Sequence, residues 1–171
     1  MTGQELWFVL LGVATTVNGL LAGASADQSI EQLPARHRIG MGAYRAYSQA
    51  SHMANGRFWL IPLGIGGAAL TLAAAIWALR LNLSARRSVP VYLGGGLALA
   101  HTLSTVKAGS INWSLAPWQS AERKVADDEV VLADILQQFE RWQALRASLQ
   151  FLTFAVTVWA LAVNSSAVSS S

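Results

Sequence analysis

The chain has 171 residues, of which 53% are hydrophobic and only 12% are charged, and its mean hydropathy is +0.38. These values exclude an ordinary water-soluble domain and favour burial in lipid. The formal net charge of +3 is small and spread over the connections, so nucleic acid is not an expected partner. The chain contains no cysteine, which excludes disulfides and thiolate metal ligands.

Four segments are almost free of charge, and each approaches the roughly 20 residues that a helix needs to cross about 30 Å of hydrocarbon. They comprise residues 6–26, 58–78, 89–106 and 147–163. Backbone groups in lipid must be paired within the segment, and no alternating pattern indicates a barrel, so the spans are predicted to be helices. We therefore predict an all-α integral membrane protein: one four-transmembrane-helix bundle at 1–163, followed by a disordered polar tail at 164–171.

The first span ends in an A-x-A sequence that imitates a signal-peptide cleavage site. Glu5 and the absence of Lys or Arg before the span favour a retained helix. Its Gly19-x-x-x-Gly23 motif permits close approach of a second helix, and Asn18 beside that motif needs a hydrogen-bond partner in lipid. Asn18 is therefore either an interhelical hydrogen-bonding residue or a substrate contact.

The polar connection at 27–57 spaces its alanine and tyrosine residues as a helix does, which predicts an amphipathic helix at the membrane interface. His37 and His52 share a stripe of that helix but lie about 22 Å apart at 1.5 Å per residue. They cannot share one ion, so no metal site is predicted. A haem or metal ligand from a single histidine is an alternative.

Trp59 and Trp77 lie near the two ends of the second span, as interfacial aromatic residues do. The short connection that follows contains Arg80, Arg86 and Arg87 and no acid. Because short basic loops remain in the cytoplasm, both termini are predicted to be cytoplasmic, in a bacterial plasma membrane.

The third span carries His101, the only ionisable side chain deep inside any of the four predicted spans. Low-dielectric surroundings favour the neutral imidazole, which can accept a proton or bind a metal. Three roles stay open: a hydrogen bond to Asn18 or Thr153 that joins two helices, a general base, or a cofactor ligand.

The acidic residues 127–129 precede an amphipathic stretch, as expected at a helix N-terminus. This helix is predicted to continue into the fourth span. Arg146 shares a face with Trp142 on it. We expect Arg146 to point inward and to pair with Glu140 or with a carbonyl near Asn112.

Two motifs resemble those of the anthrone oxygenase-like family of small four-helix membrane proteins. The first is Ile111-Asn112-Trp113-Ser114-Leu115-Ala116-Pro117-Trp118, and the second is Phe139-Glu140-Arg141-Trp142-Gln143-Ala144-Leu145-Arg146. The Pro34-Ala35 pair after the first span is also typical of that family. The chain departs from the pattern at Gln143-Ala144, where many members have Asn-His.

The resemblance implies oxygenation of a flat phenolic or quinone-like substrate, whose own carbanion reacts with oxygen without a metal or organic cofactor. It places five residues at the family site: Asn112, Trp118, Glu140, Trp142 and Arg146. Because the family histidine is missing, His101 would have to act as the base. Asn112 and Arg146 would then stabilise the enolate, and Trp113, Trp118 and Trp142 would line the pocket.

Two functions from different classes therefore remain open. The first is an oxidoreductase that takes an apolar small-molecule substrate from the bilayer. The second is a non-catalytic bundle that binds a lipid, a quinone, haem or a partner membrane protein. A homo-oligomer is compatible with either.

The predicted orientation leads to a direct test. If the basic connection at 80–90 determines topology, a reporter fused after Ser171 should be found in the cytoplasm. Paired fusions, one fluorescent only in the cytoplasm and one active only outside it, measure this. Activity of the second fusion would reverse the orientation.

Overall fold

The computed structural model describes residues 2–40, 43, 46, 47, 50, 56–113 and 125–168. Every element within these ranges is a helix, and four helices are long and apolar enough to cross a membrane. The prediction of an all-α, four-helix membrane protein is confirmed.

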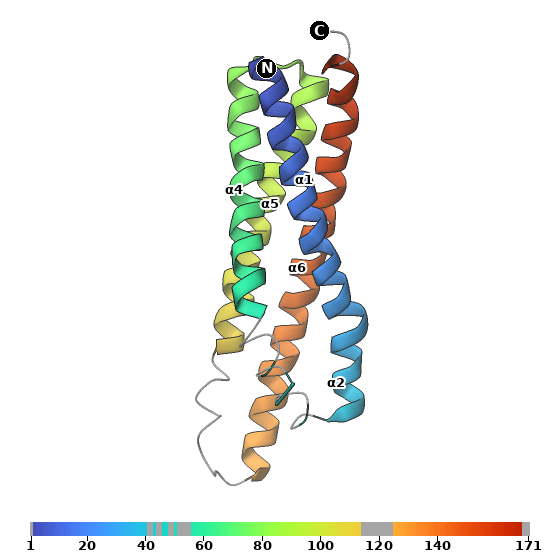
Figure 1. Ribbon diagram of the computed structural model, residues 1–171. Helices are drawn as coiled ribbons and strands as arrows, with labels where there is room; N and C mark the ends of the chain where they lie inside the picture. Colours follow the sequence, from blue (N-terminus) through green and yellow to red (C-terminus); the bar gives the residue numbers. More distant parts are fainter. Residues whose placement is uncertain are drawn as a thin grey trace.

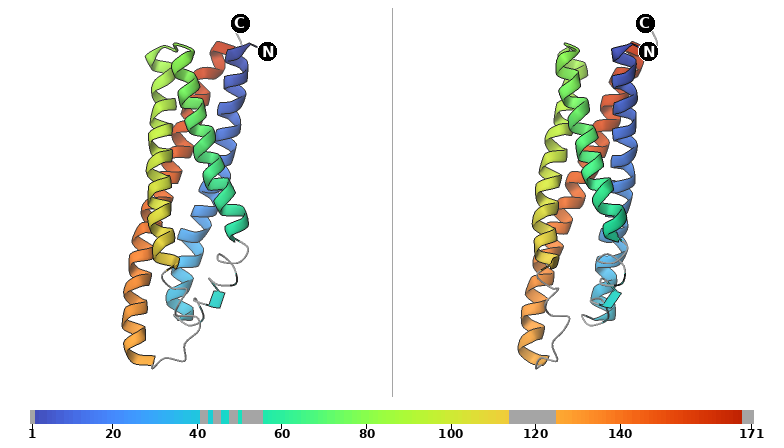
Figure 2. Two further views of the ribbon diagram at one scale, coloured as in Figure 1. Left: turned by 90° about the vertical axis from the view of Figure 1, so that its left-hand side faces the viewer. Right: turned by 60° about the vertical axis from the view of Figure 1, so that its left-hand side comes forward.

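The helices form an antiparallel bundle. α1 (Gly3–Asp27) starts at the end that holds both termini, and α4 (Arg57–Arg80) returns to that end (Figure 1). α5 (Ala85–Trp113) then runs away from it, and α6 (Val125–Val168) returns. α1 and α5 each pack against both α4 and α6, so the connectivity is up-down-up-down, and Figure 2 shows this packing from two further sides.

The first helix is longer than predicted. α1 is followed directly by the π-helix η1 (Gln28–Gln32) and by α2 (Leu33–Ile39), which continues past the start of α4. Pro34 has no N–H to donate, and in a regular α-helix its ring would clash with the carbonyl oxygen four residues earlier. The wider π turn before Pro34 avoids this clash. Residues 28–39 of the predicted interfacial helix are therefore an extension of the first membrane helix. Most of 41–55 lies outside the described residues.

The last helix is also continuous, as predicted from the sequence. α6 has 44 residues, or about 66 Å at 1.5 Å per residue, so it exceeds the thickness of the hydrocarbon core about twofold. The predicted disordered tail began at 164, but α6 continues to Val168 and Asn164 is fully buried. Asn164 Nδ2 donates to the Ala160 and Arg87 carbonyls, so this residue belongs to the packed bundle and not to a disordered tail.

Buried positions follow a seven-residue repeat. On α1 they recur at alternating steps of four and three: Trp7, Leu11, Ala14, Asn18, Leu21 and Ser25. This spacing is that of left-handed coiled coils and most helix bundles. Large apolar side chains face outward instead, such as Ile65 at 65% and Leu103 at 72% exposure. Small or polar side chains inside and large apolar ones outside are typical of packing in lipid.

Glycine permits the closest helix contacts. A Cβ atom added to Gly94 on α5 would lie 3.3 Å from the Thr157 methyl on α6 and 3.7 Å from the Thr71 methyl on α4. Gly96, two residues further along α5, has nothing within 4 Å of the same position. Gly94 is therefore a packing position, whereas Gly96 faces outward.

We predict that Gly94→Leu destabilises the bundle by about 1–3 kcal/mol through overpacking. Gly96→Leu is the matched control, because both substitutions remove one glycine from the same helix. Thermal unfolding in detergent should show a lower melting temperature for Gly94→Leu alone. Equal melting temperatures would contradict the close α4–α5–α6 contact.

Candidate functional site

The inward face of α6 carries buried polar side chains from Gln143 to Asn164. Its polar side chains occupy successive turns: Gln143, Arg146, Gln150, Thr153, Thr157 and Asn164. All except Arg146 are at most 1% exposed. Four of them lie seven residues apart, a pattern that is visible in the sequence and that our sequence reasoning missed. Because polar groups buried in lipid need partners, the pairing of each one indicates its role.

A layer without buried unpaired side-chain atoms lies in the middle of the bundle. Asn18 Nδ2 donates to Thr71 Oγ1 at 2.8 Å and to the Ala14 carbonyl at 2.9 Å. Gln150 Nε2 donates to the Asn18 carbonyl at 3.0 Å and to Asn18 Oδ1 at 3.2 Å. Asn18, Thr71 and Gln150 thus join α1, α4 and α6. Of the two roles considered for Asn18, this geometry is that of the interhelical hydrogen bond.

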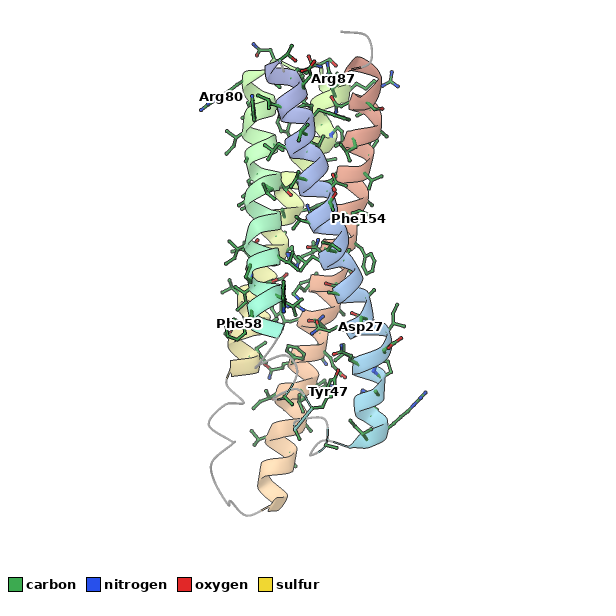
Figure 3. All side chains as sticks on the ribbon, viewed as in Figure 1. Asp27, Tyr47, Phe58, Arg80, Arg87 and Phe154 are labelled. Carbon is green, nitrogen blue, oxygen red and sulfur yellow. The ribbon has the colours of Figure 1, made fainter. Side chains whose placement is uncertain are left out.

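A second polar group lies toward the end with the termini. Arg87 Nε donates to Asn164 Oδ1 at 2.8 Å, and Asn164 Nδ2 donates to the carbonyls of Ala160 and Arg87. Figure 3 shows Arg80 and Arg87 at this end. One of the three basic residues used to predict the orientation therefore also joins α5 to α6.

A third polar group lies at the other end of the membrane region, where α1 passes into η1. Gln28 Oε1 accepts hydrogen bonds from Gln143 Nε2 and from Arg146 Nη2, both at 2.7 Å. Gln28 follows Asp27, which is labelled in Figure 3. Gln28, Gln143 and Arg146 are joined by these bonds, and Ser29 is the next residue of η1 after Gln28; we call these four residues the Arg146 cluster. Two of its members come from η1, and π turns are frequent at functional sites.

The Arg146 cluster is incompletely paired. Ser29 Oγ, Gln143 Oε1 and Arg146 Nε are buried and have no hydrogen-bond partner in the structure. Within the described part of the chain, no carboxylate lies within 4 Å of the Arg146 guanidinium. The cluster therefore differs from the middle layer, because it combines an unneutralised cation with two unused polar atoms.

His101 lies on α5 and is 6% exposed. Its Nε2 is 3.4 Å from Thr105 Oγ1, and Arg146 is the charged residue within electrostatic reach of its ring. Asn18 bonds to Thr71 and Gln150, and the Thr153 hydroxyl donates to the Leu149 carbonyl. Neither of these described residues is therefore the hydrogen-bond partner of His101.

The partner expected for Arg146 was different. On a helix, Glu140 and Arg146 are six residues and about 240° apart, so their side chains diverge. The structure supplies Gln28 of η1 as acceptor, and Glu140 Oε1 lies 3.1 Å from His37 Nε2 of α2. Both contacts depend on the extension of the first helix, which the sequence reading had placed at the membrane surface.

The remaining candidate residues are only partly described. Trp142 is half-buried on α6. Asn112 and Trp113 form the last turn of α5, but their side chains, and all of Trp118, lie outside the described residues. The candidate site therefore consists of His101, Arg146 and its neighbour Gln143, whose side chains the structure describes.

Comparison of the chain with models of protein families, with curated proteins and with solved structures gives no match. The chemistry of the side chains is therefore the basis for a function.

We predict that Gln28→Leu destabilises the protein, because it leaves Arg146 Nη2 and Gln143 Nε2 without their acceptor. Each orphaned buried donor costs about 1–3 kcal/mol. Gln138→Leu is the control, since its hydrogen bond to Asp134 is exposed. Thermal unfolding in detergent measures both variants, and an unchanged melting temperature for Gln28→Leu would mean that Gln28 does not hold Arg146.

Proposed function

We propose that this integral membrane protein binds a flat apolar molecule with a phenol or carbonyl oxygen at the Arg146 cluster, and that it oxygenates this molecule. The observation that carries the proposal is Arg146 Nε, a buried cationic donor without a partner among the described residues. Arg146 lies toward one end of the membrane region, and burial of its charge without a counter-charge still costs free energy. A ligand oxygen with negative charge would offset that cost.

The buried atoms without a partner include both a hydrogen-bond donor and a hydrogen-bond acceptor. Arg146 Nε can only donate, Gln143 Oε1 can only accept, and Ser29 Oγ can do either. An aromatic ketone with a neighbouring phenol offers an acceptor and a donor in one rigid plane. An acyl chain offers neither. The pattern therefore supports the substrate class that the family resemblance implies over a simple lipid tail.

His101 supplies the basic group in this scheme. Its imidazole removes a proton from the methylene group that is conjugated with the substrate carbonyl, and the electron pair moves onto the carbonyl oxygen beside Arg146. The resulting enolate adds molecular oxygen to form a hydroperoxide, which loses water to leave a second carbonyl. In total, one methylene and one oxygen molecule become one carbonyl and one water.

The rate enhancements that a general base and an oxyanion donor provide are known from other enzymes. General-base catalysis typically contributes about 10²–10⁴-fold to a rate. A preorganised donor to the developing oxyanion contributes about 10²–10³-fold. The other residues of the site need only bind the substrate and leave access for oxygen, because the substrate carbanion itself reduces oxygen.

The second candidate function is a non-catalytic bundle that holds a quinone, haem, a lipid or a partner membrane protein. The observation that favours it is the layer of Asn18, Thr71 and Gln150, which shows that buried polar residues in this bundle also serve to join helices. The two functions differ in turnover, not in binding. Binding without oxygen uptake would identify the second.

We predict that His101→Gln binds a hydroxylated anthrone normally but loses oxygen uptake by about 10²-fold or more, because glutamine keeps hydrogen bonding and removes the base. Arg146→Lys should weaken binding as well, because a point charge cannot replace the planar fork that bonds both Gln28 and the ligand. Oxygen-electrode rates and quenching of tryptophan fluorescence in detergent measure the two effects.

Arg141→Lys is the matched control, because Arg141 is exposed on the same helix. Its uptake and binding should equal those of the unmodified protein. No uptake by the unmodified protein with tight anthrone binding would leave only the binding function. Full activity in His101→Gln would remove this residue from the reaction.

A further inference from the structure

A shallow hollow lies on the lipid-facing side of α4, near the end with both termini. It is lined by Ala73, Ile76, Trp77 and Arg80 and has a volume of about 440 Å³. These residues follow the i, i+3, i+4, i+7 pattern and therefore share one helix face. Ala73 has the smallest of the four side chains, and we call its position the floor of the hollow; Trp77 is half-buried and also packs against the core of the bundle. The hollow is within the size range of small-ligand sites, about 300–1,000 Å³.

The two ends of this hollow differ in chemistry. Toward the membrane interior its lining is apolar, while Arg80 closes it in the last turn of α4. Figure 3 shows the Arg80 side chain extending away from the bundle. Arg80 makes no ion pair within the described part of the chain, and the indole N–H of Trp77 has no acceptor there. Arg80 therefore places an unpaired cation at the end of an apolar hollow whose lining also offers the neutral indole N–H of Trp77.

The charges around the hollow are mostly positive. Arg86 lies in the first turn of α5 at the same end of the bundle, and the connection at 81–84 contains no acid. Glu5 is the acidic side chain of this end among the described residues, and it caps α1 by accepting from the Thr2 backbone at 2.8 Å. The local field therefore favours an anion at Arg80.

We propose that this hollow, which we call the α4 groove, binds one anionic phospholipid. An acyl chain lies over Ala73 between Ile76 and Trp77, and the phosphate accepts a charge-assisted, forked hydrogen bond from the Arg80 guanidinium. The N–H of Trp77 donates to an ester or phosphate oxygen at the interface, as interfacial tryptophans do. The groove faces the bilayer, so lipid is the molecule present there at high concentration.

Charge selects the headgroup. A zwitterionic lipid brings an ammonium group toward Arg80 and Arg86, whereas an anionic lipid brings net negative charge. Anionic lipids are concentrated in the cytoplasmic leaflet, where each nearby basic residue contributes about 1 kcal/mol of attraction. A lipid bound here would therefore help to fix the orientation predicted from the basic connection. It does not depend on the proposed oxygenase function, because the Arg146 cluster lies at the other end of the membrane region.

The test is native mass spectrometry of the full chain in detergent, with phosphatidylglycerol or phosphatidylcholine of identical acyl chains added at equal concentration. We expect retained phosphatidylglycerol to exceed retained phosphatidylcholine by at least fivefold. Arg80→Gln should lower phosphatidylglycerol retention at least threefold, and Ala73→Leu, which fills the floor but keeps the charge, should lower it as much. Arg141→Gln is the control, because it removes the same charge from an exposed position on α6, at the end of the bundle opposite to the hollow.

Each outcome decides the proposal. Equal retention of the two lipids, or equal loss in Arg80→Gln and Arg141→Gln, would show only a general charge effect and overturn it. A loss in Arg80→Gln with none in Ala73→Leu would mean that phosphate binds without the groove, which also overturns it. Both variants alter exposed side chains, so thermal unfolding is expected to confirm that they fold.

Discussion

The structure depends on the requirement that buried polar groups in lipid be paired. The inward face of α6 presents a polar side chain at almost every turn, and no water in the bilayer core can satisfy it. The partners must come from the facing helices, which restricts how the four helices fit together. In the middle layer, Asn18 provides both a donor and acceptors, so α4 and α6 are held in one register against α1. Side chains with less hydrogen-bonding capacity could not join three helices at one level.

The three polar groups of the bundle differ in how completely they are paired. The middle layer uses the hydrogen-bonding capacity of Asn18. The group at Asn164 leaves one nitrogen of Arg87 unpaired, near the end of the bundle. Only the Arg146 cluster combines an unneutralised charge, an unused acceptor and an unused hydroxyl beside a buried imidazole. A closed rigid layer next to an open polar cluster is the arrangement expected of a bound small molecule, since the first holds the helices and the second offers the contacts.

The π-helix connects the fold to this cluster. A regular helix through Pro34 would lose a backbone hydrogen bond, and the wider turn of η1 lies directly before it. The same segment places Gln28 and Ser29 opposite α6, where Gln28 fixes two donors of that helix. Pro34 lies six residues after Gln28, and the π turn between them carries two residues of the site. The long extensions of α1 and α6 beyond the four-helix region pack through the same contacts and the His37–Glu140 pair.

The sequence alone determined the four helices, their order and the continuity of the last one, because lipid burial requires long uncharged segments with paired backbones. It also identified His101 as unusual, since ionisable side chains deep inside a span are rare, and it predicted that Arg146, just before the fourth span, points inward. It did not identify Gln28, Ser29 or Gln143, whose polarity is ordinary until their surroundings are known. The seven-residue spacing of Gln143, Gln150, Thr157 and Asn164 was present in the chain and indicates a polar inward face. Which partner meets each of these residues was decided only by the tertiary structure, because hydrogen bonds between helices depend on the register and rotation of elements up to 132 residues apart. The spacing of residues along one helix determines which side chains share a face, but it does not determine which residues of other helices that face contacts.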